Sequence, residues 1–159
     1  MNALIEHLDR QIESSRRLLK IVLAQGESIR RQDVEGVLAR LADVQMEMAQ
    51  RGRIELERDD LLRSEATRIG VAPDTLDLEA MLAGRPAAEG IHARAKSAEL
   101  KGLLSEIGNV HDQNRVLLRQ ELTFLDHLLR VVSGSPQGGY SRAGWSTTPS
   151  LVSAVDARA

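Results

Sequence analysis

The chain has 159 residues, the size of one ordinary domain, and 28% of them are charged while only 2% are aromatic. Abundant Leu, Ala, Glu, Gln and Arg favour helices over sheets, so the composition predicts an all-α protein. The lack of Cys excludes disulfides and zinc–thiolate sites, and the formal net charge of −2 gives no electrostatic reason to expect nucleic acid as a partner.

The amino-terminal residues have neither the basic region nor the long apolar region of a secretory signal. The longest apolar run near them, residues 21–24, is far shorter than the roughly 20 residues that span a membrane. We therefore expect a cytoplasmic protein with no membrane insertion.

Three helix stops divide the chain, and each is a glycine followed by a proline. They are Gly70 with Pro73, Gly84 with Pro86, and Gly134 with Pro136. Glycine accepts the left-handed conformation that ends a helix, and a proline just beyond cannot continue it. These stops predict a helical domain over residues 1–133 and a flexible Gly/Ser-rich tail over residues 134–159.

Residues 2–31 are predicted to form the first helix, because apolar side chains recur on one helical face. They are Leu4, Leu8, Ile12, Leu19, Val22 and Ile29. Asp33 is the predicted N-cap of the next helix, with Glu35 in its first turn. The intervening turn is short, so the two helices are expected to form an antiparallel hairpin.

Residues 34–69 are predicted to form a second helix about 54 Å long. Its expected stripe is Leu38, Leu41, Gln45, Met48, Gly52, Glu55, Asp59, Leu62, Ala66 and Ile69. Both ends of this stripe are apolar, but its middle is polar and also carries arginines. We expect the middle to be exposed or to face a partner.

Residues 71–87 are predicted to form a connector with a short helix, capped by Asp74 or Thr75 and burying Leu78, Met81 and Leu82. A last helix follows over residues 88–132. Its apolar stripe is wider than the two-per-heptad pattern of a coiled coil. The expected architecture is an elongated antiparallel bundle of three long helices plus the connector helix and the flexible tail.

An enzymatic interpretation starts from Glu89 and His92, the sole Glu-x-x-His pair. A di-iron site in a helical bundle needs two such pairs and two further glutamates, so a solvated pair is the expected explanation. The other histidines, His7, His111 and His127, lie in separate turns. No phosphate-binding loop or nucleophile elbow is present, and we predict no catalytic site, no metal and no cofactor.

An interaction protein is the alternative, because an elongated helical layout leaves apolar surface for a partner. The last helix could equally pack on the hairpin or on a second copy of the chain, which leaves a homo-oligomer possible. Tyr140 and Trp145 in the tail could provide weak transient docking, fold back onto the bundle, or have no role.

These features together resemble the FlgN-type flagellar export chaperones. The resemblance rests on the long hairpin, the connector, residues 114–118 leading into Leu125, Leu128 and Leu129, and the segment from Tyr140 to Gly144. The family commonly has a tyrosine followed within a few residues by a basic residue and glycine, as Arg142 and Gly144 are here. It usually has an acidic residue after the tyrosine, where this chain has Ser141.

The resemblance implies a chaperone that escorts hook-associated flagellar proteins to the type III export apparatus. It implies that the last helix binds the client, through Leu117, Leu118, Leu122, Leu125, Leu128 and Leu129. It also implies that Tyr140, with Arg142 and Trp145 in the same segment, contacts the cytoplasmic domain of the export gate. The competing interpretations are a coiled-coil scaffold or self-assembling dimer without a client, and a metal-dependent bundle enzyme.

Overall fold

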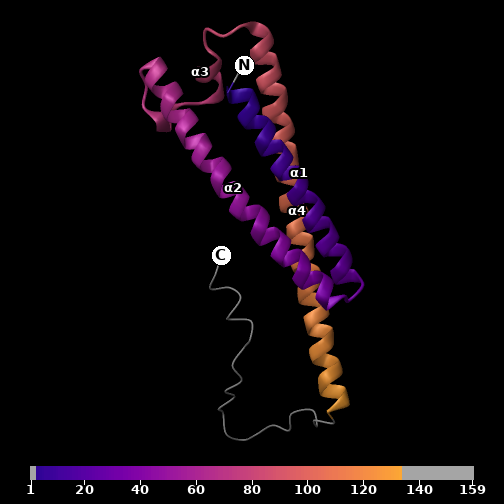
Figure 1. Ribbon diagram of the computed structural model, residues 1–159. Helices are drawn as coiled ribbons and strands as arrows, with labels where there is room; N and C mark the ends of the chain where they lie inside the picture. Colours follow the sequence, from indigo (N-terminus) through magenta and orange to yellow (C-terminus); the bar gives the residue numbers. More distant parts are fainter. Residues whose placement is uncertain (1–2, 134–159) are drawn as a thin grey trace, which may run out of the picture. The chain divides into compact units, whose positions relative to one another are not determined.

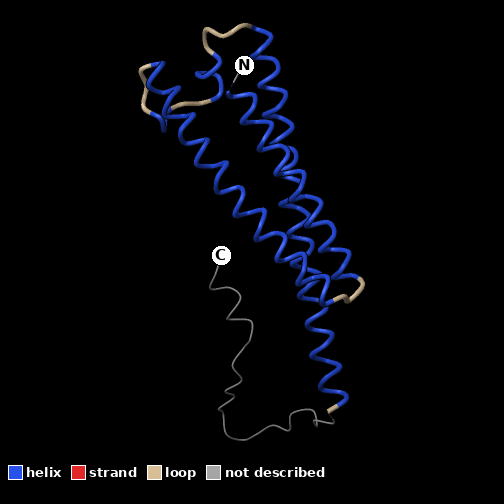
Figure 2. Tube along the Cα trace, in the orientation of Figure 1, coloured by secondary structure: helices blue, strands red, loops and turns tan. Residues whose placement is uncertain are grey.

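The computed structural model describes residues 3–133, and every regular element within this range is a helix (Figures 1 and 2). The elements in chain order are α1 (Ala3–Arg30), α2 (Val34–Ile69), the 3-10 turn η1 (Pro73–Thr75), α3 (Leu78–Leu82) and α4 (Ala87–Val132). No strand occurs among the described residues, and the all-α fold class is confirmed. By its contacts the chain divides into two units, Met1–Thr123 and Phe124–Ala159.

The turn between α1 and α2 forms where it was predicted, and Asp33 caps α2. The Asp33 carboxylate accepts a hydrogen bond from the backbone N–H of Gly36 at 2.9 Å. The chain reverses through Gln32, which has a φ of 57° and donates its N–H to the carbonyl of Ile29 at 3.0 Å. Contacts along α1 and α2 confirm the antiparallel hairpin (Figure 1).

Two of the three predicted helix stops are confirmed. Gly70 follows α2 with a φ of 80° and donates its N–H to the carbonyl of Ala66 at 2.8 Å. Gly84 follows α3 with a φ of 77°. The third stop, Gly134 with Pro136, lies outside the described residues.

The connector helix begins later than predicted. Its cap is Asp77, whose carboxylate accepts the N–H of Ala80 at 2.7 Å, and neither Asp74 nor Thr75 caps it. Those two residues belong to η1, which Pro73 opens and after which the backbone is extended again. The extended backbone separates η1 from α3, so a cap in η1 could not serve α3.

The core of the first unit joins α1, α3 and the first part of α4. Its buried members are Leu4, Leu8, Ile12, Met81, Leu82, Ala93 and Leu100. The predicted burial of Met81 and Leu82 is confirmed, while Leu78 is only partly buried. On α1, Leu18 is buried and the predicted Leu19 is only partly buried. Among the described residues, no helix combines the length and apolarity that a membrane crossing requires.

The predicted stripe of α2 packs only at its carboxyl-terminal end; its middle is exposed as expected, but its apolar amino-terminal end, Leu38 and Leu41, is exposed too. Its exposed members are Leu38, Leu41, Gln45, Met48, Gly52, Glu55 and Asp59, whereas Leu62, Ala66 and Ile69 are at least partly buried. The side chains shielded along the middle of α2 each lie one position earlier. They are Val44, Glu47, Arg51 and Ile54. The stripe that leucine and methionine periodicity picks out is therefore not the one that packs on α1.

A polar layer between α1 and α2 explains this shift. Ser14 donates its hydroxyl to the buried Glu47 carboxylate at 2.6 Å, and Arg17 Nε donates to the same carboxylate at 3.0 Å. Arg51 Nη1 donates to Ser15 Oγ at 3.0 Å. Burial opposes ionisation of Glu47, but the hydrogen bonds from Arg17 and Ser14 outweigh it and hold its pKa below the ordinary value. The polar middle of α2 thus contacts α1 through Glu47 and Arg51, while the middle members of the predicted stripe, from Gln45 to Asp59, are exposed as expected.

Candidate interaction surfaces

Within the first unit, the α1–α2 hairpin covers the apolar face of α4 less and less as α4 approaches Glu121. Gln32, in the turn between α1 and α2, donates its side-chain amide to the Glu121 carboxylate at 2.9 Å. Leu117 and Leu118 just before this point are partly buried, and Leu122 just after it is 63% exposed. The hairpin turn therefore marks where the apolar face of α4 becomes open in this unit.

In the second unit, every apolar side chain from Phe124 to Val132 is exposed. Leu125, Leu128 and Leu129 are the predicted client-binding residues in this segment, and all three are exposed. The segment does contain an ion pair, between Asp126 and Arg130 at 2.7 Å on the helical i, i+4 spacing. Nothing among the unit's own described residues covers its leucines.

The predicted docking residues cannot be located in the same way. Tyr140, Arg142 and Trp145 all lie outside the described residues. Their assignment therefore stays a prediction from the sequence.

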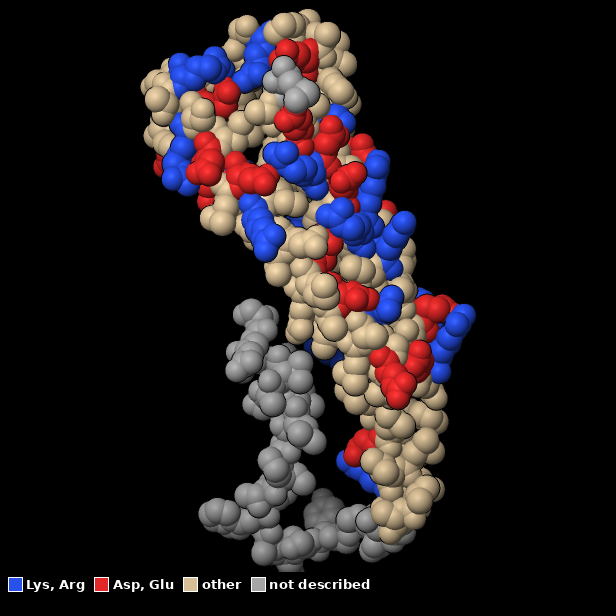
Figure 3. Space-filling model, in the orientation of Figure 1, with Lys and Arg blue, Asp and Glu red and all other residues tan. Residues whose placement is uncertain are grey.

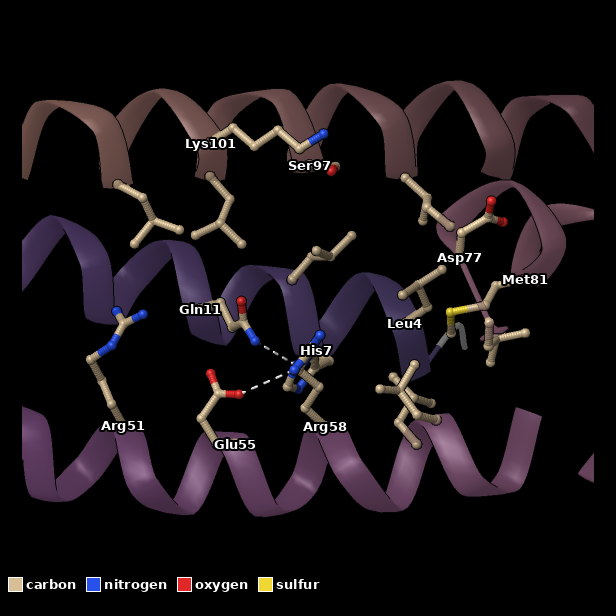
Figure 4. A pocket seen from close by; sticks show the side chains of 17 residues that line it. Leu4, His7, Gln11, Arg51, Glu55, Arg58, Asp77, Met81, Ser97 and Lys101 are labelled. Carbon is tan, nitrogen blue, oxygen red and sulfur yellow. Dashed lines mark hydrogen bonds and ion pairs between the residues drawn. The ribbon is translucent and has the colours of Figure 1, made fainter. Parts of the chain in front are cut away.

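A pocket of about 480 Å³ lies in the first unit, between α1, α2, α3 and α4 (Figure 4). Leu4, Met81 and Leu100 contribute apolar walls, while Arg51 and Lys101 contribute charged side chains. The pocket brings together none of the predicted client-binding residues. It collects residues from all four helices, and sequence periodicity gave no signal for it.

His7 is buried against this pocket and is held as a neutral side chain. The amide Nε2 of Gln11 lies 2.8 Å from His7 Nε2, so the histidine accepts this hydrogen bond (Figure 4). Burial lowers the pKa of His7, the charges of Arg10 and Arg58 lower it further, and Glu57 and Glu55 oppose them. Because Nε2 accepts, the proton of the neutral imidazole lies on Nδ1, which is buried and has no hydrogen-bond partner among the described residues.

The free energy of unfolding is expected to decrease at acidic pH, where His7 becomes protonated. Its folded pKa lies below the unfolded value of about 6.5, so the unfolded state binds the proton first as pH decreases. The free energy of unfolding should therefore decrease below about pH 6.5, by at most about 1.4 kcal/mol per pH unit from this group. Thermal unfolding followed by circular dichroism between neutral pH and mild acid measures the effect.

His7→Gln keeps an acceptor for Gln11 and removes the titration, so its unfolding temperature should change less over the same pH range. The matched control is His111→Gln at an exposed position, which should behave like the wild type. If the unfolding temperature of the His7 variant depends on pH as strongly as that of the wild type, His7 is not the group responsible.

A second buried polar contact joins α4 to α1. Asn114 is buried, and its amide Nδ2 donates to the carbonyl oxygen of Val22 at 2.7 Å and lies 3.5 Å from Gln25 Oε1. Gly26 makes the close approach possible, because a Cβ built there would lie 2.5 Å from Asn114 Oδ1. These contacts define the register of α4 against α1 within the first unit. Sequence reasoning missed them, although a glycine inside a helix was an available signal.

The candidates for an enzymatic site are not gathered into one. Within residues 3–133, no group of three or more His, Asp or Glu side chains is placed to hold a metal ion. Glu89 is partly buried and pairs with Arg85 at 3.7 Å, while His92 is exposed. On the face shown in Figure 3, acidic and basic side chains are interspersed and form no extended basic patch.

Comparison with protein families gives a match over most of the chain. A family model described as FlgN protein matches residues 1–148, which is most of the chain. No curated protein and no solved structure matches the chain.

Proposed function

The chain belongs to the FlgN family of flagellar export chaperones, and from that premise we propose that it acts in the cytoplasm as the chaperone of hook-associated proteins. It binds these clients, prevents their premature assembly and delivers them to the flagellar type III export apparatus. The observation that supports client binding is the apolar face of α4, which is open at Leu122 in the first unit and at Leu125, Leu128 and Leu129 in the second.

Client recognition in this proposal is the pairing of apolar helical faces. A client helix with apolar residues at i, i+3, i+4 and i+7 lies along the leucines of α4. Leu117 and Leu118 are partly buried, so they offer a smaller contact than the exposed leucines that follow them. The same client surface would otherwise pair with other client molecules, and its occupation by α4 delays assembly. This role is binding, and it needs no catalytic residue and no cofactor.

Delivery in this proposal uses Tyr140, with Arg142 and Trp145, to contact the cytoplasmic domain of the export gate. Two aromatic side chains bury about 150–250 Å² each, or roughly 8–12 kcal/mol gross at about 25 cal/mol per Å². Ordering the segment and losing free tumbling remove much of that free energy. The remaining affinity is about micromolar or weaker, which suits a contact that must be released after each delivery.

Tyr140→Ala is expected to separate the two activities. The variant should bind a hook-associated protein as the wild type does, because the substitution lies outside α4. It should lower export of that protein several-fold, because the aromatic contact with the gate is lost. A binding titration on purified full-length proteins measures the first, and secretion of the client into the culture medium measures the second.

Ser141→Ala is the matched control, since it changes the neighbouring residue and should leave both activities unchanged. Normal secretion by the Tyr140 variant would contradict the docking assignment. Failure of the wild-type chain to bind any hook-associated protein would contradict the chaperone proposal as a whole.

A further inference from the structure

One side of α2, over residues 34–56, presents an apolar face to solvent. Its exposed large members are Val34, Leu38, Leu41, Met48 and Leu56. Their spacing places them on one side of the helix, and the one polar side chain near the centre of this side is the uncharged Gln45. Val34, Leu38 and Leu56 are 68%, 60% and 65% exposed. We call this side the outer face of α2.

The apolar and charged sides of α2 are placed in the reverse of the way an ordinary surface helix places them. A helix on a single folded unit normally buries its apolar side and exposes its charges. In α2, Glu47 and Arg51 point inward to hydrogen-bond with Ser14 and Ser15 of α1, while the outer face carries three leucines and Met48. An apolar face of this length, left outside while charge is placed inside, indicates a surface that another polypeptide covers.

The sequence of the outer face is complementary to itself when read in the opposite direction. An antiparallel pair of α2 helices related by a two-fold axis at Gln45 brings together residues at equal distances before and after that position. The resulting pairs are Leu38 with Gly52, Leu41 with Ala49, Met48 with Ala42, and Val34 with Leu56. In the three inner pairs a large side chain meets a small one, which lets two helices approach closely and interdigitate.

Charge at the edge of the outer face fits the same symmetry. Glu35 and Arg53 lie on the same edge of α2, about 80° from the line through Gln45. Under this two-fold symmetry, Arg53 of one copy lies level with position 37 of the other. Glu35 is two residues from that position, which is about 3 Å along the helix. Both side chains are exposed, and within the described part of the chain neither forms an ion pair. The pairing would therefore form two symmetric salt bridges.

We propose that a second copy of this chain covers the outer face of α2, and that the protein forms a two-fold symmetric dimer through antiparallel α2 helices centred on Gln45. This goes beyond the chaperone function, since the client-binding leucines belong to α4. The self-complementary sizes of the facing residues and the paired Glu35 and Arg53 are what select a second copy as the occupant.

Light scattering of the full-length chain over a wide concentration range tests this dimer. The wild type should have the mass of two chains. Leu38→Asp should weaken self-association about a hundredfold or more, because its carboxylate would be buried against Gly52 of the second copy. Ile91→Asp is the matched control: Ile91 is 68% exposed on α4, and its replacement should leave the dimer intact. Circular dichroism confirms that both variants remain helical.

Charge reversal tests the register. Glu35→Arg alone and Arg53→Glu alone should each weaken the dimer about tenfold, because each places like charges together. The double variant carrying both changes should restore it. Because the chain lacks cysteine, Gln45→Cys also provides a single thiol that a short bismaleimide should cross-link between copies, whereas Ile91→Cys should not be cross-linked.

A wild-type chain that stays monomeric at all concentrations would overturn the proposal. A dimer that survives both Leu38→Asp and the single charge reversals would also overturn it, because another surface would then form the interface. If the wild type is monomeric and Leu38→Asp abolishes binding of a hook-associated protein, the client occupies the outer face. This result too would overturn the assignment of a second copy to that face.

Discussion

Replacing Leu122 and Leu129 together by aspartate is expected to abolish capture of a hook-associated client. The two side chains are 63% and 68% exposed, so the chain loses little of its own packing when they are changed. In the complex, each carboxylate would be transferred from water into an apolar contact without a partner, at a cost of several kcal/mol. The affinity should therefore fall at least about a hundredfold. A binding titration with purified client measures the loss.

The control for this experiment is Ile91→Asp, which introduces the same charge at an equally exposed apolar position near the start of α4. It should bind the client normally. Circular dichroism should show that the double leucine variant remains as helical as the wild type. If a helical double variant still captures the client with normal affinity, the leucines of α4 are not the client-binding surface.

Gly26→Ala is expected to destabilise the protein, although alanine is the better helix former. The new Cβ would lie 2.5 Å from Asn114 Oδ1, so Asn114 must move. Moving it breaks the 2.7 Å hydrogen bond to the Val22 carbonyl and leaves a buried amide without a partner, at a cost of about 1–3 kcal/mol. After the gain in helix propensity of about 0.5–1 kcal/mol, the free energy of unfolding should fall by about 1 kcal/mol. Urea denaturation measures it.

Gly108→Ala makes the same chemical change on α4, where a new Cβ meets no atom within 4 Å. It should stabilise the protein by about 0.5–1 kcal/mol, so the two substitutions have opposite signs. Combining Gly26→Ala with Asn114→Ala removes the clash and should cost less than the sum of the two single changes. A stabilising effect of Gly26→Ala would show that α4 can shift along α1 without penalty.

The helix boundaries were predictable because the signals that end helices are local. Asp33 caps α2 through a hydrogen bond to a residue three positions away, and Gly70 ends it through its own backbone conformation. Asp74 and Thr75 show the limit of such signals. Both are good capping residues, but Pro73 opens a separate turn before them, and the cap that α3 uses is Asp77.

The apolar stripe of α4 was equally predictable, since periodicity depends only on spacing. The exposed part of this stripe was not predictable, because its extent depends on where the α1–α2 hairpin ends alongside α4. The contact of Gln32 with Glu121 sets this point in the first unit, and it joins residues that are far apart in the chain. The docking role of Tyr140, Arg142 and Trp145 stays a prediction from the resemblance alone.

The sequence by itself determined an all-helical chain, the bounds of its long helices and its relation to the FlgN family. Only the tertiary structure decided which side of α2 faces α1. Periodicity favoured the leucines and methionines, but the serines of α1 offer hydroxyls that bind Glu47 and Arg51. Asn114 likewise needs a carbonyl from another helix before it can be buried. A polar side chain is stable inside a protein only beside its partner, and the position of that partner is a property of the folded chain.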